Sequence, residues 1–177
     1  MKKLSDECQL IVKHILTRNT EYNMAQKPAN QISMTISRLQ KILYFSQIEY
    51  IKHTGNIMFE DDFYATSKGP GIKEVHNYYI DYATGRMDTL KFPSGTISKD
   101  KQIIIDIILE NTNSIDTDVL TKYSCKIDNL WINAYNNEDN RFISKSNLIK
   151  YYKPNNKPKT KKRTKRETRY YKQNTVK

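Results

Sequence analysis

Leu39-Gln40-Lys41-Ile42-Leu43-Tyr44-Phe45-Ser46-Gln47 is the stretch that decides the fold of this chain, and Ser67-Lys68-Gly69-Pro70-Gly71 follows it. Apolar side chains recur at helical spacing around the first stretch and cover a broad arc, which indicates a helix buried on more than one side. Thr35 suits the cap that starts this helix, and Gly55 suits the residue that ends it. We therefore expect a central core helix, and then a structural turn at Gly69-Pro70-Gly71 that opens a second helix.

The flanking sequence predicts further short helices and one β element. Ser5 suits a helix cap, and the apolar spacing after it ends near Arg18, so residues 19–33 are expected to form a loop. Residues 57–66 favour a short strand or irregular turn, and residues 85–96 a loop that includes a hairpin at most. Further helices are predicted at residues 72–82, after Ser98, after Asp116 or Thr117, at residues 130–135 and after Ser144. The fold class is thus mainly α, a compact single-domain helical bundle with a minor β element.

The positive charge of the chain is concentrated at its C-terminal end. The chain has 177 residues, 30 Lys and Arg, and 19 Asp and Glu. Residues 153–177 contain 11 of these bases and 1 acid, a net charge of 11 − 1 = +10, which leaves 19 − 18 = +1 for residues 1–152. Residues 153–177 also lack apolar periodicity, so we expect residues 1–152 to form the folded domain and residues 153–177 a disordered basic tail.

The basic tail is a candidate binding segment. Polycations release counterions from nucleic acid, and aromatic side chains can stack on bases. A basic tail can equally bind an acidic protein face, and we favour either partner over an inert extension. The candidate residues of the tail are Lys161, Lys162, Arg163, Lys165, Arg166, Arg169, Tyr170 and Tyr171.

The composition favours a soluble protein of the cytoplasm. Cys8 and Cys125 are far apart in sequence, and the beginning of the chain does not resemble a signal peptide, so reduced thiols are expected rather than a disulfide. The sequence has no uninterrupted apolar run long enough to cross a membrane. Thirteen tyrosines exceed what a core needs and are consistent with a protein partner, since tyrosine is enriched at interfaces.

The sequence offers little evidence of catalytic or metal chemistry. His14, His53 and His76 do not share the paired spacing of a zinc site with the two cysteines. Glu60-Asp61-Asp62 could be combined with a histidine into an acid–base group, but an acidic turn that keeps the segment soluble, or that receives a basic partner, is the better interpretation. The Gly-Pro-Gly turn lacks the spacing of known phosphate loops. We therefore expect no catalytic residue, no cofactor and no metal, and a protein that is not an enzyme.

Several blocks of the chain, in order, resemble the Panacea (SocA-like) antitoxin domain family. Residues 39–47 resemble the family's L-Q-K-L-L-Y-x-x-Q helix, and residues 53–55 its x-T-G turn. Residues 63–70 stand where the family has F-x-A-W-x-x-G-P, and residues 72–78 resemble its V-x-x-E-V-Y segment. The later blocks, residues 120–134 and 143–152, resemble L-T-H…P-W-x-x-A and I-x-x-x-x-I-x-x-Y-F. The resemblance covers roughly residues 5–152 and leaves out the basic tail.

The resemblance implies a mostly helical fold and an antitoxin role in a toxin–antitoxin system of a prophage or other mobile element. Such a protein would bind and neutralise a cognate toxin, or a host defence protein if it is phage-borne. Contacts are expected on the exposed side of the central helix and around the Gly-Pro turn, at Lys41, Tyr44, Gln47, Lys68 and Glu74. The alternative is a nucleic-acid-binding regulator that acts through the basic tail.

Overall fold

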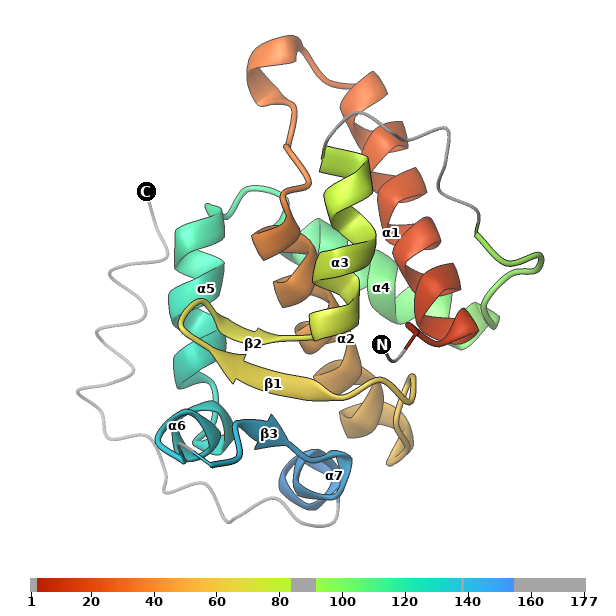
Figure 1. Cartoon of the computed structure of the whole chain (residues 1–177). Helices are drawn as coiled ribbons and strands as arrows, with labels where there is room; N and C mark the ends of the chain where they lie inside the picture. Colours follow the sequence, from red (N-terminus) through yellow and green to blue (C-terminus); the bar gives the residue numbers. More distant parts are fainter. Residues whose placement is uncertain (1–2, 84–91, 138, 155–177) are drawn as a thin grey trace, which may run out of the picture.

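The computed structural model describes residues 3–83, 92–137 and 139–154, which form a mainly helical protein with a small sheet (Figure 1). This confirms the predicted fold class. The helices within these ranges are α1 (Asp6–Met24), the 3₁₀-helix η1 (Pro28–Asn30), α2 (Ile36–Thr54), α3 (Lys73–Ala83), α4 (Lys99–Thr112), α5 (Thr117–Lys126), α6 (Leu130–Tyr135) and α7 (Lys145–Tyr152). The strands are β1 (Phe63–Thr66), β2 (Gly69–Gly71) and β3 (Phe142–Ile143).

Helix α2 is the central helix of the core, as its broad apolar arc predicts. It packs against α4, α5 and α7, and Leu39, Ile42 and Leu43 are fully buried. Burial of each such side chain contributes about 1.5–3 kcal/mol. The Oγ1 atom of Thr35 accepts a hydrogen bond from the Arg38 amide at the start of the helix, and Gly55 closes it with a left-handed φ of 74°. Both predicted ends are confirmed.

Three antiparallel strands form the sheet in the order β2-β1-β3. Gly69-Pro70-Gly71, predicted as a turn, is instead the edge strand β2, paired so that Ala65 lies opposite Pro70. The chain reverses just before it, and Gly69 has a φ of +86°. Proline is compatible with an edge strand because such a strand pairs on one side only. The amide N–H that Pro70 lacks is not needed there for a hydrogen bond between strands. Strand β3 was not predicted, because two residues are too few to show a period.

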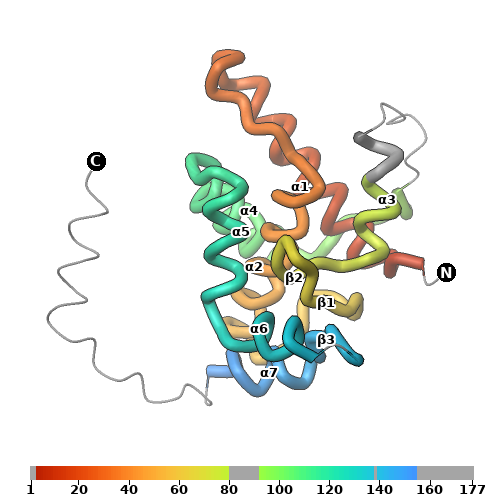
Figure 2. Tube along the Cα trace, turned by 60° about the vertical axis from the view of Figure 1, so that its left-hand side comes forward, coloured from red at the N-terminus to blue at the C-terminus, as the bar shows by residue number. Residues whose placement is uncertain are grey.

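Helix α1 continues beyond its predicted end near Arg18. Its apolar face stops at Leu16, and the last turns are held by polar contacts instead. The side chain of Asn23 accepts a hydrogen bond from the Ile32 amide at 2.8 Å and donates one to the Ile32 carbonyl at 2.9 Å. Figures 1 and 2 show the η1 end of α1 at one end of the molecule and α7 at the other. The apolar pattern stopped early because the helix projects beyond the core.

The remaining helix starts follow the predicted capping residues. Ser5, Asp116 and Ser144 each accept a backbone hydrogen bond at the start of α1, α5 and α7. Ser98 precedes α4, but its side chain makes no capping hydrogen bond. Residues 85–91 of the predicted 85–96 loop, and nearly all of the basic tail, at residues 155–177, lie outside the described residues.

Candidate protein-binding groove

Gln47 of α2 holds the segment that enters the β1–β2 hairpin. Its Oε1 atom accepts a hydrogen bond from the Met58 amide at 2.9 Å, and its Nε2 atom donates to the Phe59 carbonyl at 3.4 Å. The side chain is fully buried. The polar atoms of a buried amide side chain need hydrogen-bonding partners. Here they pair with a backbone N–H and a backbone C=O, as the backbone of a neighbouring strand would.

Gln40 holds the segment that leaves the same hairpin. Its Oε1 atom accepts from the Ile72 amide at 2.8 Å, and its Nε2 atom donates to the Ile72 carbonyl at 2.9 Å. The neighbouring Lys41 donates through Nζ to the Pro70 carbonyl at 2.8 Å. Gln40 and Gln47 are separated by two turns of the helix and therefore share a face. We call the contacts of Gln40, Lys41 and Gln47 with residues 58–72 the hairpin clamps.

Lys41 is a buried cation beneath the hairpin. Burial lowers the pKa of its ammonium group to about 8. Gly69 lies against it so closely that a Cβ atom there would be 3.0 Å from Lys41 Nζ and 2.8 Å from Ser124 Oγ. The site therefore excludes any larger residue, for steric reasons as well as for the positive φ of Gly69.

Tyr44 tethers α2 to the C-terminal part of the described fold. Its hydroxyl donates to Asp128 Oδ2 at 3.0 Å, and the hydroxyl of Tyr152 in α7 donates to the same oxygen. The other carboxylate oxygen accepts from the Leu130 amide at 2.8 Å and so holds the start of α6. Burial, and then the negative charge of Asp128, raise the pKa of both tyrosines well above the ordinary value. One buried carboxylate thus joins α2, α6 and α7.

The predicted exposure of Lys41, Tyr44 and Gln47 is wrong. At 1%, 0% and 0% exposure, all three side chains bond inside the protein. The prediction assumed that polar side chains on a helix face solvent. Here these side chains instead face backbone groups of the hairpin and the buried carboxylate of Asp128. The separation of Gln40 and Gln47 by two helical turns, on an otherwise apolar helix, was the signal that could have revealed the clamps.

Lys68 and Glu74 are the two predicted contact residues that the surface retains. Lys68 is exposed beside the chain reversal between β1 and β2, and Glu74 is half-buried in the first turn of α3. Their role in partner binding stays a prediction.

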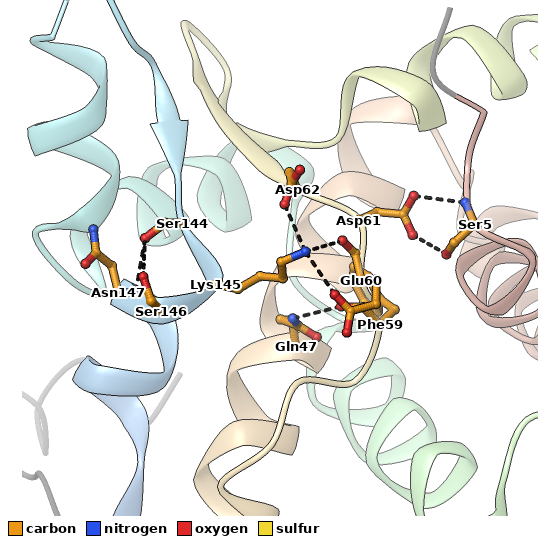
Figure 3. Close-up of polar contacts among 10 residues, drawn as sticks. All are labelled: Ser5, Gln47, Phe59, Glu60, Asp61, Asp62, Ser144, Lys145, Ser146 and Asn147. Atoms are coloured by element: carbon orange, nitrogen blue, oxygen red, sulfur yellow. Dashed lines mark hydrogen bonds and ion pairs between the residues drawn. The ribbon is translucent and has the colours of Figure 1, made fainter.

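The acidic residues 60–62, predicted to form a soluble turn or to receive a basic partner, bind residues of the chain itself (Figure 3). Lys145 Nζ lies 3.0 Å from Glu60 Oε2 and 3.2 Å from Asp62 Oδ1. Asp61 is buried and accepts hydrogen bonds from the amide and the hydroxyl of Ser5. These acids join the hairpin to α7 and to the start of α1.

A groove of about 680 Å³ lies where α2, the hairpin and the start of α3 meet. Ile36, Gln40 and Lys41 line it from α2. Pro70 and Ile72 line it from the hairpin side, and the exposed side chains of Lys68, Lys73 and His76 stand around it. Lys73 Nζ lies 4.1 Å from the centre of the Tyr64 ring, a cation–π contact that positions the ammonium group. The hairpin clamps therefore build a groove with an apolar floor and a basic rim.

His14 and His53 make ordinary contacts with acidic side chains, whereas His76 lies at the groove. His14 Nε2 lies 3.0 Å from Asp106 Oδ1, and His53 Nε2 lies 3.1 Å from Glu49 Oε1. Among the described residues, no group of three or more His, Cys, Asp or Glu side chains is arranged to hold a metal ion. In the same part of the chain, no helix has the length and apolar character needed to cross a membrane.

The helical scaffold, with the groove on its surface, forms a small, mainly helical domain built around one central helix. The family model of the SocA-like antitoxin Panacea domain matches residues 39–132, which is more than half of the chain. The chain therefore belongs to the SocA-like antitoxin Panacea domain family. No curated protein and no solved structure matches it significantly. The matched region includes α2 from Leu39 onward, the hairpin and every residue of the groove from Gln40 to Asn77.

Proposed function

We propose that this protein is an antitoxin that binds a toxic protein in the cytoplasm and neutralises it by direct contact. The toxin is either the product of a neighbouring gene in a prophage or mobile element, or a host defence protein. The observation that carries the proposal is the membership of the antitoxin family over residues 39–132. The groove supports it, because its lining combines apolar surface with exposed charged groups, as protein interfaces do.

Co-expression tests the proposal. The neighbouring gene is induced in a bacterial host with and without the full-length chain, and growth is measured. We expect induction alone to stop growth, and co-expression to restore it. The two purified proteins should then co-elute from a size-exclusion column as one complex.

The choice of variants separates direct neutralisation from an indirect effect. Lys68→Glu reverses an exposed charge beside the groove, and Lys13→Glu makes the same change on the exposed side of α1. We expect only Lys68→Glu to weaken both rescue and co-elution. Two results would contradict neutralisation of the protein encoded by the neighbouring gene. One is that this protein is harmless, and the other is that its toxicity persists although the antitoxin is soluble and folded. A host defence protein would then be tested in the same way.

A second candidate function is nucleic-acid-binding regulation through the basic tail, favoured by the net charge of +10 over residues 153–177. Neutralisation of phosphates by such a segment makes affinity fall steeply with salt. The full chain would be compared with a variant in which Lys161, Lys162, Arg163, Lys165, Arg166 and Arg169 are glutamine, and with a Tyr170→Ala, Tyr171→Ala variant. Binding of duplex DNA that is insensitive to salt, or unaffected by the six substitutions, would argue against this function.

A further inference from the structure

The groove between α2, the hairpin and α3 is positively charged although the domain around it is almost neutral. Residues 1–152 carry 19 bases and 18 acids, yet Lys41, Lys68 and Lys73 all line the groove. No acidic side chain of the described residues lines it. This local excess of cations results from the arrangement of the groove, because the composition of the domain alone would give a mixed surface.

The positive groups of the groove lie around its rim and beneath its apolar floor. Lys68 and Lys73 are exposed, while Lys41 is 1% exposed and contacts the Pro70 carbonyl. Because the pKa of Lys41, about 8, lies above neutral pH, its ammonium group remains mostly charged there. A cation that is kept in an apolar environment attracts a negative group more strongly than one in water does.

The backbone edge of the hairpin beside the groove already has hydrogen-bonding partners. Lys41 occupies the Pro70 carbonyl, and Gln40 occupies both the amide and the carbonyl of Ile72. An occupant therefore cannot add itself here as another strand through these groups. Its recognition depends on side chains, with apolar groups against Ile36 and Ile72 and negative groups toward the lysines.

Charge also decides between possible occupants. The C-terminal segment of the chain carries a net charge of +10 and would be repelled by the basic rim. The acids at residues 60–62 of a second copy are held by Lys145 and Ser5 of that copy. A nucleic acid would supply negative charge, but the apolar floor at Ile36, Pro70 and Ile72 favours an aliphatic side chain over a phosphate backbone.

We infer that this groove binds an acidic segment of the neutralised protein, with an aliphatic side chain on the floor and flanking carboxylates at Lys68 and Lys73. The inference rests on the proposed function and gives the chemical class of the partner's contact segment. A toxin that is neutralised here carries such a segment on its surface or at a chain end.

Peptide binding tests the inference without a toxin. The probes are short fluorescein-labelled peptides in which one leucine is flanked on both sides by glutamates, and matched peptides with glutamine in place of every glutamate. Anisotropy is measured with the full chain in the background that carries the six tail substitutions to glutamine, so that the tail does not bind the probe. We expect the glutamate peptides to bind more tightly than the glutamine peptides.

Two double variants then locate the binding site. Lys68→Gln with Lys73→Gln should weaken binding about tenfold, because neither exposed ammonium group can then pair with a glutamate of the peptide. Lys13→Gln with Lys150→Gln removes the same charge from exposed positions on α1 and α7 and should leave binding unchanged. Circular dichroism and the Tm of both variants establish that they fold. In NMR titrations, the amides of Gly69, Gly71 and Ile72 should shift.

Three results would overturn the inference. They are equal binding of the glutamate and glutamine peptides, equal loss of binding in both double variants, and displacement of the probe from the groove by single-stranded DNA at lower concentration than by unlabelled glutamate peptide. Growth rescue by co-expression is scored separately. Rescue without peptide binding refutes the acidic segment alone, and peptide binding without rescue refutes neutralisation of the neighbouring product alone.

Discussion

Replacement of Gln40 by methionine tests whether the hairpin clamps hold the groove together. Methionine has nearly the length of glutamine and no strong polar atom, so the change removes the hydrogen bonds of 2.8 and 2.9 Å to Ile72 while it fills much of the same space. Gln40 is 7% exposed, so water does not readily replace the lost partner.

The structure sets the size of the expected effect. The amide of Ile72 would be left buried without a partner, and such a group costs about 1–3 kcal/mol, whereas the Ile72 carbonyl still accepts from the His76 amide at 3.4 Å. Methionine recovers part of this through its own apolar burial. We expect the free energy of unfolding of Gln40→Met to fall by about 1–3 kcal/mol, a substantial part of the stability of a typical domain.

Equilibrium urea unfolding, followed by the fluorescence of Trp131, measures the loss. Hydrogen exchange then locates it, because the Ile72 amide should lose protection more than the core amides of α4 do. Gln26→Met is the control, at a half-buried position beyond the end of α1. If Gln40→Met costs less than about 0.5 kcal/mol and the Ile72 amide keeps its protection, the clamp reasoning is refuted.

Three further predictions use the same unfolding assay. Asp128→Ala removes the acceptor of three hydrogen bonds, two of them buried, and should cost about 3–5 kcal/mol. Asp139→Ala at an exposed position should cost almost nothing, and a loss below about 1 kcal/mol in Asp128→Ala would contradict this reasoning. The pKa of Lys41 is about 8 in the folded state and 10.5 ordinarily, so between pH 8 and 10.5 the unfolded state binds more protons than the folded state. The free energy of unfolding should therefore rise by about 1–2 kcal/mol from pH 7.5 to 9.5, and Lys41→Met should abolish this rise. Gly69→Ala should cost about 1–3 kcal/mol more than Gly95→Ala. Both glycines have positive φ, but a Cβ atom at Gly69 would meet other atoms at 2.8 and 3.0 Å, whereas the nearest atom at Gly95 is 3.9 Å away. Equal losses in the two variants would mean that backbone strain is the whole effect.

The sequence was sufficient to predict the features that depend on local or periodic signals. The apolar arc of α2 identified the core helix, and Thr35 and Gly55 identified its ends, because capping depends on residues within one turn. The strand at residues 63–66 was one of two predicted options. These features are encoded near the residues that show them.

The inward-facing polar residues of α2 could not be assigned in the same way. In the sequence alone, the polar pattern of Gln40, Lys41 and Gln47 resembles a solvent-facing stripe. Their hydrogen-bonding partners lie in residues 58–72, after the end of α2, and the helix pattern itself gives no sign of them. The exposure of a polar side chain depends on a long-range contact, which a single sequence does not display. The same reason explains Glu60 and Asp62, which pair with Lys145 of the distant helix α7.

A hairpin fastened at both ends by one helix separates the residues that maintain the architecture from those that choose a partner. The clamps engage mostly backbone groups of residues 58, 59, 70 and 72, which most residue types supply equally well. Thr66, Ser67 and Lys68 lie between the fastened ends and are exposed. Substitutions there can alter recognition with little effect on the core, so a scaffold of this kind can acquire new partners while α2 keeps the same anchor points.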